Sequence, residues 1–247
     1  MKAQNSPLRT EAATRLQAVC PQATSEDAQA PVIADGTLEA LKWLGVVLMA
    51  LDHLNKYMLG ESNAVLFDLG RMVMPLFGFV LMYNLARPGA LSAGVHRRVM
   101  RRLLTFGALS TPMFVALVSW WPLNILFMLL LATGIVWLIE RGGPARITLA
   151  SLAFVVAGAL VEFWWFGVLS CLGAWAYCRR PTPLRLGLWV LALASLWFVN
   201  RNFAALAVLP LLWGATRVDV PLVRNRWVFY AFYPLHFMVI LLASKLP

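Results

Sequence analysis

Three ionisable side chains stand close together in an otherwise apolar stretch, LDHLNKYML, which covers residues 51–59. They are Asp52, His53 and Lys56, and they end an apolar run that begins near Leu41. Histidine titrates near neutral pH, and an adjacent carboxylate can hold one of its tautomers. The Asp-His pair therefore has the chemistry of a general base that takes a proton from a substrate.

Two later apolar runs carry side chains that could complete such a site. Asp68 and Arg71 share one face of a predicted helix, which returns from the end of the first, so Arg71 comes to about the depth of His53. His236 stands near the middle of the last apolar run, with Tyr233 on the same helical face. Two of the three histidines thus lie in apolar runs with a carboxylate and an arginine at overlapping depth. This combination favours proton transfer over mere packing.

Two other interpretations of these groups stay open. In the first, the charged side chains of the first two runs form ion pairs between helices, which offsets a burial cost on the order of 2.5–3.5 kcal/mol for each charge. In the second, both histidines and Asp52 bind zinc. We do not expect a metal, because these residues come from distant helices without a local ligand motif.

Other polar residues give weaker signals. The candidates for substrate contact are Lys56, Asp68, Asn124, Arg201 and Tyr233. Glu162 belongs either to the same vestibule or to an interfacial turn, and we expect His96 to be solvated in a basic loop. The cluster of Arg97, Arg98, Arg101 and Arg102 is a topology signal that touches anionic lipid or, alternatively, attracts an anionic cytosolic cofactor.

The composition indicates an integral membrane protein. Of the 247 residues, 61% are hydrophobic and 13% are charged, which lies far from the balance of a soluble globular domain. Each helical crossing takes about 20 mainly apolar residues, so the chain has room for eight or nine crossings with short loops. We predict a single all-α, polytopic bundle of about nine transmembrane helices over residues 36–247, with eight as the alternative.

Nine segments have the character of membrane-crossing helices. The preceding residues 1–35 are polar, lack the apolar core of a secretory signal, and predict a disordered cytoplasmic tail. The predicted crossings cover 38–59, 65–86, 100–119, 122–139, 147–161, 164–178, 186–199, 203–213 and 227–245. Residues 186–213 are divided into two crossings only by Asn200, Arg201 and Asn202.

Lysines and arginines sort to one side of this arrangement. With the N-terminus inside, the inner side receives Lys2, Arg9, Arg15, Lys42, Arg87, Arg97, Arg98, Arg101, Arg102, Arg141, Arg146, Arg179, Arg180, Arg185, Arg217, Arg224 and Arg226. The outer half receives only Lys56, Arg71, Arg201 and Lys245. This asymmetry satisfies the positive-inside rule and predicts an outer C-terminus. The net charge of +10 then reflects topology, so we expect membrane lipids and not nucleic acid as contacts.

Four apolar segments have distinctive sequences. They are DGTLEALKWLGVVLMALDHLNKYML, GRMVMPLFGFVLMYNLAR, LNILFMLLL and FYAFYPLHFMVILL. The most characteristic elements are the Asp-His pair, the Arg-x-x-x-Pro-Leu-Phe-x-Phe pattern and the Tyr-Pro-Leu-His near the end. Together these segments resemble the TraX family of conjugal transfer membrane proteins. The resemblance runs from about residue 35 to 245 and excludes the polar tail.

This resemblance implies a transferase of the bacterial inner membrane that modifies the conjugative pilin subunit, first of all by N-terminal acetylation. It also implies a likeness to integral membrane acyltransferases that use a first-helix histidine. In that case His53 is the base or acyl relay and Arg71 anchors an anionic group. His236 is then a second pocket residue, and Asp52 orients one of the histidines.

The sequence leaves two possible donors of the transferred group. Acetyl-CoA is cytosolic, whereas the predicted topology opens the site to the periplasmic half, so this donor has to reach in from the arginine-rich inner face. Alternatively a phospholipid donates its head group or an acyl chain, with Arg71 and Arg201 on the phosphate. No CoA-binding signature decides between them. A proton-coupled transporter or pilus assembly factor is the alternative of another class, because transporters also use buried Asp, His and Arg.

Overall fold

Residues 32–244 are described by a computed structural model. Residues 1–31 and 245–247 lie outside the described part, so most of the predicted tail is not placed, nor are Lys2, Arg9, Arg15 and Lys245. Within residues 32–244 the regular secondary structure is helical, and the backbone makes one isolated bridge between Leu123 and Val161. The predicted all-α class is confirmed.

Short connections join the helices. Their bounds are α2 Asp35–Tyr57, α3 Ala64–Gly70, α4 Val73–Ala86, α5 Val95–Leu117, α6 Ile125–Arg141, α7 Pro144–Gly158, α8 Trp164–Arg179, α9 Pro183–Ala194, α10 Trp197–Asn200, the 3-10 helix η1 Ala204–Ala207, α11 Val208–Ala215 and α12 Arg226–Ala243. Each predicted segment corresponds to one of these helices or to two consecutive ones. Two stretches, Ala64–Ala86 and Pro183–Asn200, are long and apolar enough to cross a membrane, judged by length and composition.

The second predicted segment is broken between α3 and α4. Pro75 has no N–H to donate to the carbonyl of Arg71, four residues earlier, and its ring crowds that carbonyl. The chain therefore turns at Arg71 and Met72 before α4 begins. The break places Arg71 at a helix end, where its side chain is free to turn toward α2.

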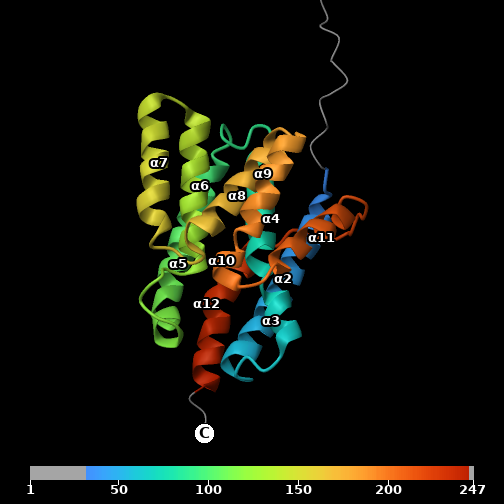
Figure 1. Cartoon of the computed structure of the whole chain (residues 1–247), viewed down its shortest axis with the longest axis vertical. Helices are drawn as coiled ribbons and strands as arrows, with labels where there is room; N and C mark the ends of the chain where they lie inside the picture. Colours follow the sequence, from blue (N-terminus) through green and yellow to red (C-terminus); the bar gives the residue numbers. More distant parts are fainter. Residues whose placement is uncertain (1–31, 245–247) are drawn as a thin grey trace, which may run out of the picture.

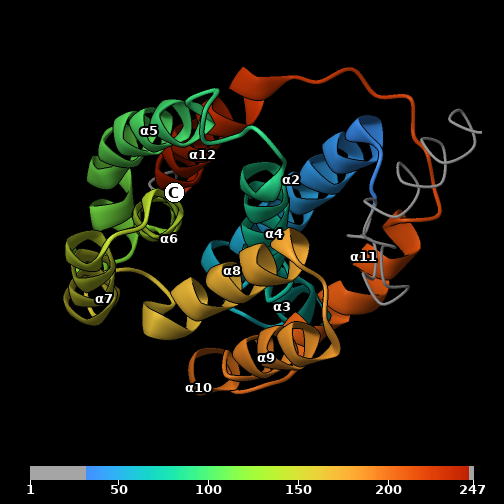
Figure 2. The same ribbon diagram turned by 90° about the horizontal axis from the view of Figure 1, so that it is seen from above.

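The first and last helices meet although the whole described chain separates them. α12 packs against α2 and α5, while α4 contacts both α2 and α8 (Figure 2). Figure 1 shows α2 and α12 running toward the same end of the molecule. The predicted contact between the first two helical segments is confirmed, since α2 packs on both α3 and α4. Side chains from α2, α3 and α12 can consequently form one site.

Apolar side chains both fill the interior and cover part of the surface. On α4, the side chains of Leu76, Phe79, Met82 and Leu85 are at most 2% exposed. Large apolar side chains point outward on the peripheral helices α7 and α9: Leu149, Leu152, Val155, Val156, Leu184, Leu188 and Leu191. Helix faces that expose several large apolar side chains are suited to contact with lipid or another protein.

Candidate active site

Two histidines from opposite ends of the chain meet where α2 crosses α12. His53 Nδ1 lies 2.7 Å from His236 Nε2, which is hydrogen-bonding distance. The planes of the two rings differ by only 5°. The hydrogen bond therefore lies close to the plane of both rings, and the two histidines act as one unit.

A backbone carbonyl assigns the tautomers of this pair. His236 Nδ1 lies 3.1 Å from the carbonyl oxygen of Phe232, one turn earlier on α12. A carbonyl only accepts hydrogen bonds, so His236 Nδ1 carries the hydrogen and, in the neutral ring, His236 Nε2 is an acceptor. His53 Nδ1 must then donate to it. The lone pair of His53 Nε2 is left free to take a proton or attack an electrophile.

Asp52 does not orient a histidine, contrary to the expectation from the resemblance. Its Oδ1 accepts a hydrogen bond from Arg71 Nη2 at 2.8 Å, in an ion pair that is largely shielded from solvent. Arg71 Nε also donates to the carbonyl of Phe67 at 3.3 Å. Adjacent helical residues point about 100° apart, so Asp52 faces α3 while His53 faces α12. The orienting group is His236.

Two residues that the sequence did not single out hold the α2–α3 hairpin closed. The buried Asn55 donates from Nδ2 to the carbonyl of Asn63 at 2.9 Å, and its Oδ1 accepts from the Asn63 N–H at 3.0 Å. Gly70 lies against Asp52, since a Cβ at that position would stand 2.2 Å from Asp52 Oδ1. Only glycine allows α3 to approach so closely, and this approach brings Arg71 to the carboxylate.

Aromatic rings enclose the histidine pair. Tyr233 is 4% exposed and meets the His236 ring edge-on, at 5.4 Å between centroids. Phe237 is buried and lies 5.0 Å from the His53 ring, and Phe232 lies flat against His236 at 4.9 Å. Such walls exclude water from the reacting nitrogen and strengthen its polar interactions.

The remaining candidates for substrate contact lie outside this centre. Lys56 is exposed one turn beyond Asp52. Asp68 is exposed and accepts a hydrogen bond from Asn202 Nδ2 at 2.7 Å. Arg201 is exposed at the end of α10, 5.6 Å from the ring of Trp197. The structure links α3 to the α10–η1 turn through Asp68 and does not bring Arg201 to the histidines.

The structure places Asn124 and His96 inside the protein. Asn124 is 1% exposed and caps α6, with Oδ1 accepting from the Leu126 N–H at 3.1 Å, and its contact with a substrate stays a prediction. The prediction that His96 is solvated is wrong: its side chain is 1% exposed, and its Nε2 lies 3.5 Å from Glu140 Oε2. Helix packing buries His96, and hydrophobic periodicity does not locate such contacts.

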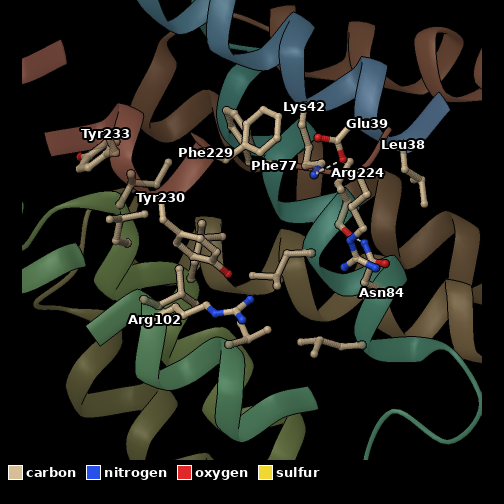
Figure 3. A pocket seen from close by; sticks show the side chains of 18 of the residues that line it. Leu38, Glu39, Lys42, Phe77, Asn84, Arg102, Arg224, Phe229, Tyr230 and Tyr233 are labelled. Carbon is tan, nitrogen blue, oxygen red and sulfur yellow. Dashed lines mark hydrogen bonds and ion pairs between the residues drawn. The ribbon is translucent and has the colours of Figure 1, made fainter. Parts of the chain in front are cut away.

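A cavity of about 190 Å³ lies on the other side of Tyr233 (Figure 3). Its charged lining residues come from the start of α2, from α5 and from the segment before α12: Asp35, Glu39, Lys42, Arg102 and Arg224. Aromatic residues complete the wall: Phe77, Phe229, Tyr230 and Tyr233. Tyr233 lines this cavity and also meets the His236 ring, so a single side chain separates the cavity from His236.

The cavity carries an excess of positive charge. Lys42 pairs with Glu39 at 2.5 Å, and the Arg87 guanidinium pairs with Asp35 and lowers the pKa of that carboxyl. Within residues 32–244, no carboxylate lies within ion-pair distance of Arg102 or Arg224. Figure 3 shows these two guanidinium groups facing the cavity from opposite sides. The cavity is therefore suited to an anionic ligand that also carries a ring.

A comparison with models of known protein families assigns this chain to a family. Residues 37–244 match the family described as TraX protein, a region that includes His53, Arg71 and His236. A search of the curated proteins and one of the solved structures find no match. The family match covers most of the sequence, from the first turn of α2 to the end of α12. The chain belongs to the TraX family.

Proposed function

We propose that the protein is a membrane-embedded acyltransferase that acetylates the conjugative pilin subunit. Membership of the TraX family implies involvement in pilin processing during conjugal transfer. The single observation that carries the transferase assignment is the His53–His236 pair, which leaves one nitrogen of His53 free as a base beside a cationic cavity. A proton-coupled transporter can also use buried histidines, but it would leave the pilin covalently unchanged.

The cavity supports acetyl-CoA as the donor. Arg102 and Arg224 offer planar, permanently charged donors for phosphate groups, and the rings of Phe229 and Tyr230 offer faces for an adenine. The opposite end at Tyr233 is where a thioester would meet His53. A phospholipid donor is less well supported, because Arg71 is already neutralised by Asp52 and Arg201 lies away from the histidines.

In the proposed reaction, the amine nitrogen of the acceptor forms a bond with the acyl carbon while the thioester C–S bond breaks. His53 Nε2 accepts the proton that the amine loses and passes it to the leaving thiolate. The resulting positive charge on the His53 ring is stabilised by the hydrogen bond from Nδ1 to His236. The buried rings around the pair keep water from competing with the amine.

The membrane location is part of this proposal. The outward apolar faces of α7 and α9 suit lipid, and the paired tryptophans Trp121 and Trp164 lie together at one end, 6.2 Å apart between ring centroids, as in an interfacial aromatic belt. The distribution of Lys and Arg then puts the N-terminus and the cationic cavity on the cytoplasmic side of the bacterial inner membrane. His53 opens toward the periplasmic half, where pilin is presented.

The test is acetyl transfer by the full chain in lipid nanodiscs, with acetyl-CoA and a peptide of the pilin N-terminus. We expect the wild type to add one acetyl group to the peptide and His53→Ala to add none. Leu54→Ala is the matched control, because Leu54 is an exposed neighbour on α2. Equal transfer by His53→Ala and the wild type would contradict the proposed role of His53.

A further inference from the structure

The turn between α7 and α8 holds a carboxylate that the proposed reaction does not use. Glu162 lies in this turn, partly buried, and its carboxyl is within electrostatic range of Lys56, Arg71 and Asp52. The charge of Glu162 also acts on Tyr233, the residue that touches the His236 ring. The Glu162 N–H is bonded to the carbonyl of Leu123, two residues before Ile125, and Ile125 lines the cavity together with Tyr233. Glu162 therefore lies at the start of α6, next to the wall that the cavity shares with the histidine pair.

The backbone fixes this turn against the loop that precedes α6. Leu123 N–H donates to the carbonyl of Leu160 at 2.7 Å, and Glu162 N–H donates to the carbonyl of Leu123 at 2.8 Å. Trp121 Nε1 adds a hydrogen bond to the carbonyl of Ala159 at 3.2 Å. Three hydrogen bonds thus hold the backbone at Glu162 against the loop that precedes α6.

The chain accepts backbone strain directly after Glu162. Phe163 and Trp164 have positive φ angles of 60° and 49°. A side chain in this left-handed region costs roughly 1–2 kcal/mol for each residue. Strain held by surrounding structure is concentrated at functional sites, where it positions a group. Here the strained pair lets α8 begin directly after the turn that holds Glu162.

The carboxylate has no ion-pair partner in residues 32–244, where no Lys or Arg nitrogen lies within 4.0 Å of it. The guanidinium of Arg71 is bound to Asp52, and Lys56 is exposed to solvent. Burial raises the pKa of the Glu162 carboxyl to about 7, and the N–H of Ile125, at the positive end of α6, opposes part of that shift. The carboxyl therefore gains and loses a proton near neutral pH, and no ion pair with a Lys or Arg of residues 32–244 neutralises it.

We propose that Glu162 binds the protonated α-amino group of the acceptor and so selects a chain terminus. This inference rests on the proposed function for the identity of the acceptor. The bound ammonium gives one proton to the Glu162 carboxylate. The resulting amine attacks the acyl carbon, the C–S bond breaks, and His53 carries the second proton from nitrogen to the thiolate. Glu162 then releases its proton to solvent, and the products are an amide and a thiol.

The experiment measures peptide binding to the full chain in nanodiscs without any donor. One probe is a peptide of the pilin N-terminus with a free α-amine, and the other is the same peptide with a hydroxyl in place of that amine. We expect the wild type to bind the amine probe at least about 10-fold more tightly than the hydroxyl probe. A charge-assisted hydrogen bond contributes enough free energy for a difference of this size. Glu162→Gln removes this preference and Glu162→Asp retains part of it. Glu61→Gln, at an exposed acid of the α2–α3 loop, leaves it unchanged.

Equal binding of the two probes by the wild type would overturn the inference, and so would a full preference in Glu162→Gln. If Glu162→Gln does not fold, the wild type and Glu162→Asp still decide, because the preference is measured within each protein. If the preference depends on Glu162 but no acetyl group moves from acetyl-CoA, the proposed transferase function fails while the amine site stands.

Discussion

Replacing His236 tests the assignment of tautomers most directly. His236 Nε2 accepts from His53 Nδ1 at 2.7 Å, and this bond becomes a hydrogen bond to a cation when His53 takes the substrate proton. A hydrogen bond to a charged group contributes about 1.5–3 kcal/mol. At 1.36 kcal/mol for each factor of ten, its loss slows transfer by about 10-fold to 150-fold.

Two substitutions separate this effect from packing. His236→Phe keeps a ring of similar size but removes the acceptor, so it should show the full loss. His236→Gln places an amide oxygen near the position of the lost nitrogen, so the hydrogen bond is retained and we expect a loss below about 10-fold. Leu235→Phe, at an exposed neighbour on α12, is the control for expression and folding.

The assay is the initial rate of acetylated pilin peptide formed by each variant in nanodiscs, with melting temperatures measured in parallel. The reasoning is refuted if His236→Phe stays within about twofold of the wild type, or if both substitutions are equally slow at unchanged stability. A second readout is ¹⁵N NMR of labelled histidine, in which neutral His53 should carry its hydrogen on Nδ1. A hydrogen on Nε2 would contradict the account directly.

Three further predictions concern other parts of the structure. Arg102→Gln and Arg224→Gln should each raise KM for acetyl-CoA about 10-fold without changing KM for the peptide. Arg217→Gln, at an exposed arginine, is the control. An unchanged KM for acetyl-CoA would show that the cavity does not bind this donor. Gly70→Ala should lower the free energy of unfolding by about 1–3 kcal/mol, since its methyl group would overlap Asp52 of the ion pair. Gly214→Ala is the control, because a methyl group there meets open space. Equal melting temperatures of the two variants would contradict the close approach of Gly70 to Asp52. Alkaline phosphatase fused after the last residue should be active in cells, because the C-terminus is predicted outside, and an inactive but stable fusion would reverse the topology.

The sequence singled out the side chains of the proposed site but not their pairing. Ionisable residues are rare in apolar helices, so Asp52, His53, Arg71 and His236 stood out by type alone. The contacts among these four side chains depend on how α2 is rotated about its axis. Packing contacts such as that of Gly70 against Asp52 determine this rotation. The adjacency of Asp52 and His53 along the chain therefore suggested a contact that the helix geometry prevents.

The cationic cavity was harder to predict. Arg102 and Arg224 are far apart in the sequence and both fit the positive-inside rule, so topology explained them without a pocket. Only the return of α12 onto α2 and α5 brings the two arginines to the same space. The position of Glu162 was hard to predict for a similar reason, because backbone hydrogen bonds between two loops hold its turn against the start of α6.

The most direct test of the central claim is the intact mass of the cognate pilin from cells. Three strains are compared: one with the wild-type protein, one with His53→Ala at matched membrane expression, and one without the gene. The account predicts that only the first pilin carries the mass of one added acetyl group. A larger added mass that also depends on His53 would point to a lipid-derived donor. Identical masses in all three strains would contradict the transferase assignment and favour a role in transport or assembly.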